Sequence, residues 1–161
     1  MTPKRTKEVV EQWMTPEPYT VDPNDSVTHA IELIEEHRIN QLPVVENGRL
    51  VGILTDRDLR DAWTLAPTHP KRKRQRRSRI DSDDIPIKAL MTRAVLTVDP
   101  SDTLEKAAKL LRDKRIGAVP VVAQTHLRGI ITRSDILDAF IGRKQSKHAN
   151  RKALLKSVNT R

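Results

Sequence analysis

The sequence contains one pattern of residues twice, at a fixed spacing of 77 positions. Met14-Thr15 recurs as Met91-Thr92, and from Met14 to Ala62 there are 21 identities in 49 positions, without a gap. Internal similarity at a fixed period indicates a duplicated structural unit. Because a unit of about 50 residues buries too little surface to be comfortably stable alone, we expect the two copies to cover each other's sheets.

Each copy follows the same order of predicted elements. A short extended piece precedes an Asp-Pro turn, since proline fixes φ and disfavours helix in the residue before it. An amphipathic helix follows, with Asp25-Ser26 or Asp102-Thr103 available to cap it. Two short aliphatic runs then predict a hairpin, which Asn47-Gly48 favours in the first copy, and a second helix comes last. We therefore predict an α+β fold of two β-α-β-β-α repeats, packed through their sheets with pseudo-twofold symmetry.

Charge is unevenly distributed along the chain, whose formal net charge is +9. Seven of the nine residues at 71–79 are Lys or Arg, and residues 143–161 contain seven more with no acid. This distribution indicates basic appendages on a mildly acidic folded part. The predicted organisation is a basic N-terminal arm (1–10), repeat 1 (11–64), a basic mobile linker (65–84), repeat 2 (85–141) and a basic C-terminal tail (142–161).

Several classes of function lack support in the sequence. There is no cysteine, and the five histidines have no spacing typical of metal ligands, so no metal site is expected. The nucleophile-elbow, Walker A and dinucleotide-binding motifs are absent, so we do not expect an enzyme. No apolar run approaches the roughly 20 residues of a membrane span and nothing resembles a signal peptide, which predicts a cytoplasmic protein without membrane contact.

One motif recurs where a predicted strand meets a helix. Gly52 to Leu59 reads G-I-L-T-D-R-D-L, and Gly129 to Ile136 reads G-I-I-T-R-S-D-I. The Thr-x-x-Asp within each is a variant of the capping box, which satisfies the first backbone N–H groups of a helix. The same position suits a ligand, because the N–H groups at a helix start favour a phosphate. The residues alone leave both interpretations open.

The whole pattern resembles a tandem pair of CBS domains. The resemblance rests on three motifs that occur in the same order in both copies. These are T-V-x-P early in the copy, L-P-V-V or V-P-V-V in its middle, and G-h-h-T-x-x-D late in it, where h is an aliphatic residue. The resemblance implies a regulatory module that binds an adenosyl ligand, such as AMP, ADP, ATP or S-adenosylmethionine, in clefts between the repeats. It also implies that the late aspartate binds the ribose hydroxyls and that the late threonine contacts phosphate or ribose.

In such pairs each cleft usually takes its Thr and Asp from one repeat and its early strand from the other. Carried onto this chain, the first cleft combines Thr55 and Asp58 with Leu96, Gly117, Ala118 and Val119. The second cleft combines Thr132 and Asp135 with Tyr19, Asn40, Gln41 and Leu42. Small residues make the cleft at Asp58 roomier, and it ranks first, although Asp56 adds a carboxylate there. Arg133 makes the cleft at Asp135 better suited to phosphate.

The resemblance also implies a homodimer, and the absence of an attached output domain predicts an unknown regulated protein as partner. Two alternatives stay open. The basic segments 71–79 and 143–161 could bind nucleic acid in a salt-dependent, sequence-independent way, because each neutralised phosphate releases a counterion. The chain could also be a scaffolding dimer whose clefts are empty.

Overall fold

A computed structural model describes residues 8–65 and 85–142, apart from the side chains of residues 62–65. The basic segments 71–79 and 143–161 therefore lie outside the described residues. The chain forms two compact units whose limits differ from those of the sequence repeats. The central unit comprises Tyr19–Val95, and the terminal unit combines Met1–Pro18 with Leu96–Arg161.

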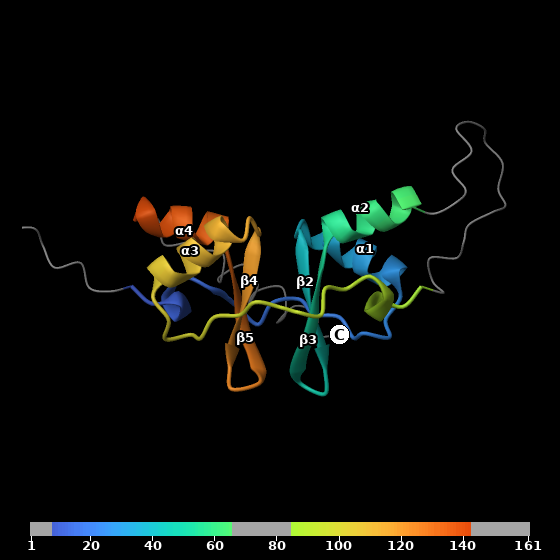
Figure 1. The fold of residues 1–161 in the computed structure, drawn as a ribbon, viewed down its shortest axis with the longest axis horizontal. Helices are drawn as coiled ribbons and strands as arrows, with labels where there is room; N and C mark the ends of the chain where they lie inside the picture. Colours follow the sequence, from blue (N-terminus) through green and yellow to red (C-terminus); the bar gives the residue numbers. More distant parts are fainter. Residues whose placement is uncertain (1–7, 66–84, 143–161) are drawn as a thin grey trace, which may run out of the picture. The chain divides into compact units, whose positions relative to one another are not determined.

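In the central unit a hairpin of two antiparallel strands lies beside two helices (Figure 1). The described elements are α1 (Val27–His37), β2 (Gln41–Glu46), β3 (Arg49–Thr55), α2 (Asp56–Leu65) and the 3-10 turn η3 (Ile87–Ala89). Asn47 and Gly48 join the strands with φ angles of 50° and 78°. Positive φ at both central positions is typical of the tight two-residue turn that an Asn-Gly pair favours.

The terminal unit has the same arrangement and one additional short strand (Figure 1). Its described elements are the 3-10 turn η1 (Val10–Gln12), β1 (Thr15–Pro16), α3 (Leu104–Asp113), β4 (Ala118–Ala123), β5 (His126–Thr132) and α4 (Arg133–Phe140). Strand β5 pairs antiparallel with both β4 and β1. The β4–β5 turn places Gln124 at a φ of 59°, which is less favourable than glycine or asparagine at such a position.

The α+β class and the repeated order of elements are confirmed. Each early extended piece forms a single parallel bridge to its hairpin, from Val21 to Val44 and from Val98 to Val121. The predicted apolar helix faces point inward, and Ala30 of α1 is fully buried.

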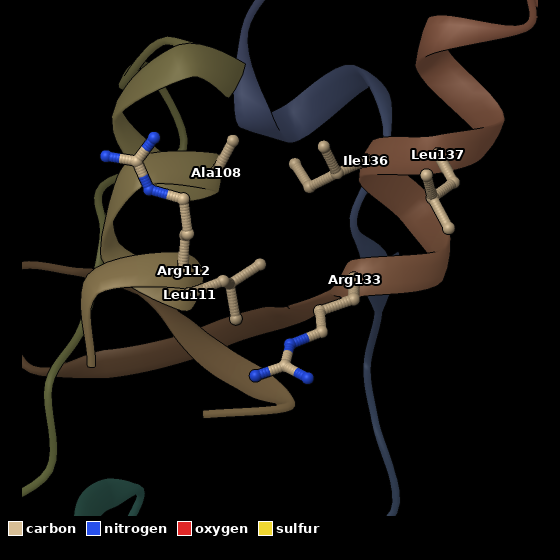
Figure 2. A pocket seen from close by; sticks show the side chains of 6 residues that line it. All are labelled: Ala108, Leu111, Arg112, Arg133, Ile136 and Leu137. Carbon is tan, nitrogen blue, oxygen red and sulfur yellow. The ribbon is translucent and has the colours of Figure 1, made fainter. Parts of the chain in front are cut away.

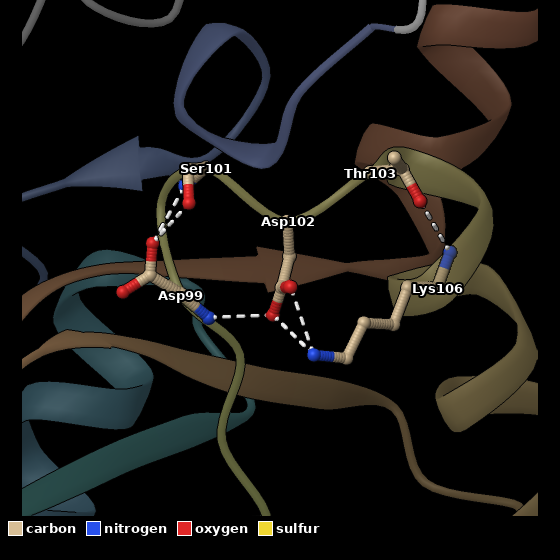
Figure 3. Close-up of polar contacts among 5 residues, drawn as sticks. All are labelled: Asp99, Ser101, Asp102, Thr103 and Lys106. Carbon is tan, nitrogen blue, oxygen red and sulfur yellow. Dashed lines mark hydrogen bonds and ion pairs between the residues drawn. The ribbon is translucent and has the colours of Figure 1, made fainter.

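A hydrogen-bonded turn leads into α3 (Figure 3). The Asp99 N–H donates to Asp102 Oδ2 at 2.8 Å, and Asp99 Oδ1 accepts the Ser101 N–H and hydroxyl at 2.9 and 2.6 Å. The Ser101 bonds lower the pKa of Asp99, and the Lys106 ammonium, 2.8 Å from both Asp102 oxygens, lowers the pKa of Asp102. Thr103 is the N-cap of α3 and accepts the Lys106 N–H at 3.2 Å.

The first copy uses the same device. Asp25 Oδ2 accepts the Asp22 N–H at 2.8 Å, and Ser26 caps α1 by accepting the His29 N–H at 3.2 Å. Of the two residues proposed for each cap, the hydroxyl residue is the N-cap in both copies. The aspartate instead holds the preceding turn.

The segment at the start of each repeat belongs to the unit built on the other repeat. Thr15, near the start of repeat 1, pairs with Ile130 of β5, and Thr92, near the start of repeat 2, exchanges two backbone hydrogen bonds of 2.9 and 3.0 Å with Ile53 of β3. Val10 and Ile87 from these segments are fully buried in the cores of the terminal and central units. Each core is therefore completed by residues far away in the sequence.

Two glycines allow these segments to approach the hairpins. A Cβ on Gly129 would lie 2.8 Å from the Thr15 carbonyl oxygen and 2.6 Å from the Met14 sulfur. A Cβ on Gly52 would lie 3.2 Å from the Thr92 carbonyl oxygen and 2.5 Å from the Met91 sulfur. The contact with backbone is tighter at Gly129.

We predict that Gly129→Ala lowers the free energy of unfolding by about 2 kcal/mol, as overpacking does elsewhere. Gly52→Ala is the matched variant and should cost less, because a methionine side chain can rotate away whereas the backbone of β1 cannot. Urea unfolding followed by circular dichroism measures both. An equal or larger loss in Gly52→Ala would show that the methionine contact sets the cost.

Candidate ligand-binding site

The Thr-x-x-Asp motif forms a reciprocal cap in both units. In the central unit, Asp58 Oδ2 accepts the Thr55 N–H at 2.8 Å and its hydroxyl at 2.7 Å, while Thr55 Oγ1 accepts the Asp58 N–H at 3.2 Å. In the terminal unit, the corresponding distances between Thr132 and Asp135 are 2.7, 2.8 and 3.3 Å. The motif therefore begins a helix in both places, as the capping interpretation predicts.

The two aspartates differ in exposure. Asp135 is buried, with 4% of its surface exposed, whereas Asp58 is half-buried. Both bonds from Thr55 end on Oδ2 of Asp58, and its Oδ1 accepts no hydrogen bond from the described residues. At Asp58, capping and ligand contact are thus compatible, because the cap uses one of the two carboxylate oxygens.

Each Thr-x-x-Asp junction lies beside the start of the first hairpin strand of its own repeat. This strand is β2 in the central unit and β4 in the terminal unit. In the central unit, Gln41 pairs with Thr55, and the Asn40 carbonyl accepts the N–H of residue 56 at 3.0 Å. In the terminal unit, Ala118 pairs with Thr132, and the Gly117 carbonyl accepts the N–H of residue 133 at 3.2 Å. The first residue of each hairpin, and the residue before it, thus contact the junction at the end of the same hairpin.

The early extended pieces run parallel to these strands. The bridge from Val21 to Val44 brings Tyr19 level with Leu42, and Tyr19 packs against the core cluster that contains Leu42. The bridge from Val98 to Val121 brings Leu96 level with Val119 in the same way.

The predicted site residues therefore gather into two groups, one in each unit. The central cluster consists of Tyr19, Asn40, Gln41, Leu42, Thr55 and Asp58. The terminal cluster consists of Leu96, Gly117, Ala118, Val119, Thr132 and Asp135. Within a unit, the structure joins each Thr and Asp to the early strand of the same repeat. The pairing across repeats that the family resemblance implied stays a prediction.

The linings of the two clusters are unequal. The terminal cluster has the small residues Gly117 and Ala118 at the strand start, and its Leu96 is 42% exposed. In the central cluster, the ring of Tyr19 stacks on the ring of His37, with centroids 3.8 Å apart and an interplanar angle of 7°. One face of the Tyr19 ring is thus covered by the imidazole of His37.

Sequence reasoning missed two residues near the central cluster. Arg60 binds Asp56 Oδ2 at 2.8 Å and so offsets the extra carboxylate beside Thr55. The spacing of four residues on a helix was a signal for this pair. His37 had no such signal, because its partner Tyr19 lies 18 residues away in a different element.

A separate pocket of about 450 Å³ lies between α3 and α4 in the terminal unit (Figure 2). Its lining is mainly aliphatic with two arginines, and consists of Ala108, Leu111, Arg112, Arg133, Ile136 and Leu137. Arg133 is the first residue of α4, so it connects this pocket with the terminal cluster. In Figure 2 the Arg133 side chain points away from Ala108 and Arg112.

Within residues 8–65 and 85–142, no three His, Cys, Asp or Glu side chains are grouped so that they could hold a metal ion. None of the helices in these ranges is long and apolar enough to cross a membrane.

Comparison with known proteins bears on the repeats and the fold. The family model of the CBS domain matches residues 9–64 and 87–142. A CBS domain-containing protein of Dictyostelium discoideum is 34% identical over 137 residues, which are 84% of this chain and 92% of the relative.

Solved structures agree with this match. The CBS domain pair of protein MJ0100, in complex with 5′-methylthioadenosine and S-adenosyl-L-methionine, is 28% identical with a TM-score of 0.71, and the match covers 86% of this chain and 100% of that one. CBSX2 in complex with AMP is 31% identical with a TM-score of 0.67, covering 86% and 99% of the two chains.

We predict that Asp135→Ala lowers the free energy of unfolding by about 2 kcal/mol and Asp58→Ala by about 1 kcal/mol. Both variants lose a cap, but Asp135 is more deeply buried than Asp58. Asp138→Ala, on the same helix and outside the cap, is the control and should change stability by less than about 0.5 kcal/mol. Urea unfolding measures all three, and equal losses at Asp58 and Asp135 would contradict the role given to burial.

Proposed function

This chain belongs to the CBS domain family as a tandem pair of repeats, and we propose that it is a non-catalytic regulatory module that binds an adenosyl ligand and modulates a partner protein. The solved CBS pairs that carry S-adenosyl-L-methionine, 5′-methylthioadenosine or AMP support this class of ligand. We also propose a cytoplasmic location.

The observation that carries the proposal is the terminal cluster. Asp135 is held by the cap beside a strand start that carries the small residues Gly117 and Ala118. Leu96 exposes an aliphatic surface on which an adenine base can lie. An aspartate at a fixed helix position can accept hydrogen bonds from both vicinal hydroxyls of a ribose, and bonds to a charged acceptor are stronger than neutral ones.

We place the preferred site at the terminal cluster. The cleft at Asp58 ranked first in the sequence analysis because small residues were expected to face it. Within the units, those small residues lie beside Thr132. Arg133 follows Thr132 directly and is exposed at the start of α4, where helix N–H groups also favour an anion. One arginine and one helix start suit a single phosphate group, so AMP is the proposed ligand.

Isothermal titration calorimetry with AMP, ADP, ATP and S-adenosylmethionine, and with adenosine for comparison, tests this assignment. We predict that Arg133→Gln weakens AMP binding about tenfold, as expected for the loss of one charge-assisted hydrogen bond, and leaves adenosine binding unchanged. Arg112→Gln is the matched control, because Arg112 lines the same pocket from α3. Equal effects of Arg133→Gln on AMP and adenosine would contradict the phosphate contact.

If none of AMP, ADP, ATP and S-adenosylmethionine binds at millimolar concentration, the sensor proposal is refuted. A scaffolding dimer with empty clefts would then be the better description. Direct calorimetry is preferable to thermal shifts for the aspartate variants, because loss of a cap changes stability by itself.

We also propose that the chain is a homodimer that uses the exposed end of α4. Leu137, Phe140 and Ile141 are 64%, 77% and 64% exposed, and they continue from the apolar wall of the α3–α4 pocket. Apolar side chains grouped in this way commonly mark an interaction surface.

Light scattering coupled to size-exclusion chromatography tests the dimer. We predict that Phe140→Glu shifts the protein from dimer to monomer, because an unpaired charge would be buried in the interface. Thr125→Glu, at an exposed position in the β4–β5 turn, should remain dimeric. A monomeric wild-type chain, or a Phe140→Glu variant that stays dimeric, would rule out this interface.

The nucleic-acid alternative concerns segments 71–79 and 143–161, which lie outside the described residues, and it stays a prediction. Deletion of 71–79 should then abolish a salt-sensitive mobility shift with RNA or DNA.

A further inference from the structure

The helix pairs of the two units carry opposite charges at two equivalent positions. In the terminal unit, Arg112 of α3 and Arg133 of α4 border the pocket between the helices (Figure 2). At the repeat spacing of 77, Glu35 of α1 corresponds to Arg112 and Asp56 of α2 corresponds to Arg133. The same two places, one on each helix of a pair, are therefore cationic in the terminal unit and anionic in the central unit.

The surface of α3 and α4 around the pocket, which we call the terminal face, combines apolar side chains with these arginines. Leu137 and Phe140 are 64% and 77% exposed, and Leu137 also lines the pocket. The Arg133 guanidinium forms no ion pair with another described residue, and Arg112 contacts only its exposed neighbour Asp113, at 2.9 Å. Arginine in such a setting is suited to a carboxylate, because its planar group can donate two hydrogen bonds at once.

The corresponding surface of α1 and α2, which we call the central face, has the complementary character. Ile31 and Ile34 are half-buried and pack against the core of the central unit, and the exposed Glu35 lies beside them on α1. Glu32 and Glu35 form no ion pair with another described residue, and α1 contains no lysine or arginine. Like charges three residues apart on a helix repel each other, so this surface favours a cationic partner.

We propose that the terminal face of one copy of this chain binds the central face of a second copy, so that Arg112 of one chain meets Glu35 of the other. The inference deepens the proposed homodimer, on which it rests, by naming the face that each copy presents. Because every copy carries both faces, a twofold axis makes the same contact twice.

Charge is what selects this arrangement over the two alternatives. Contact between two terminal faces would bring Arg112 and Arg133 of both copies together, and contact between two central faces would do the same for Glu32 and Glu35. Like charges placed opposite each other across an interface suppress binding, whereas opposite charges fix its orientation. Exposed ion pairs add little affinity, so the apolar side chains on the two faces supply the attraction and the charges select the partner face.

Exchange of the two charges tests the proposed contact in the full-length protein. We expect Glu35→Arg and Arg112→Glu each to raise the dimer dissociation constant about tenfold, since each replaces an attraction by a repulsion. The variant that combines both substitutions restores opposite charges and should associate within about threefold of the wild type. Sedimentation equilibrium measures the four dissociation constants.

Glu46→Arg is the matched control for these variants. Glu46 is exposed at the end of β2, away from both helices of the central unit, and its replacement makes the same change of net charge as Glu35→Arg. We expect its dissociation constant to equal that of the wild type. Circular dichroism of every variant shows whether the fold is kept, and recovery of association in the combined variant is itself evidence against unfolding.

The outcomes distinguish this inference from the proposed homodimer. If Arg112→Glu alone changes the dissociation constant, two terminal faces meet, and if Glu35→Arg alone changes it, two central faces meet; either result overturns the inference and keeps the dimer. The inference also fails if neither substitution has an effect, or if the combined variant associates as weakly as the single ones. A wild-type chain that is monomeric at all concentrations refutes both the homodimer and this contact.

Discussion

The cap between a threonine and the aspartate three residues later is the interaction on which the candidate sites depend. It links the end of a buried strand to the first turn of a helix, so that a carboxylate is fixed at one point beside the hairpin. The Oδ2 atoms of Asp58 and Asp135 accept two bonds each from the paired threonine, at 2.7 to 2.8 Å. A carboxylate held in this way loses little conformational entropy on meeting a ligand, because its side chain is already ordered.

Much of the fold could be predicted from the sequence, because the duplication repeats every signal. Two copies of the Asp-Pro turn, the hairpin and the Thr-x-x-Asp junction define the order of elements more firmly than one copy could. The exchange of the segments at the starts of the repeats could not be predicted in this way. Thr15 and Thr92 carry no local signal for their partners, since strand pairing across more than 35 residues is set by tertiary packing.

The composition of the candidate sites was harder to predict for the same reason. Gly117 and Ala118 are small residues by sequence, but the junction beside which they lie within a unit is set by the pairing of β4 with β5. The stack of His37 on Tyr19 leaves no periodic pattern at all, because it joins the end of a helix to an extended segment. Duplication has therefore preserved the architecture of the two copies, while substitutions at a few lining positions have made their sites chemically different.

The exchange of segments also affects how the chain is completed during synthesis. Val10 and Met14 are synthesised well before Val121 and Ile131, yet all four belong to the same core. The core of the terminal unit therefore cannot be completed while repeat 2 is still being made. Because Met91 likewise completes the core of the central unit, a chain cut between the repeats would leave each half without a buried segment.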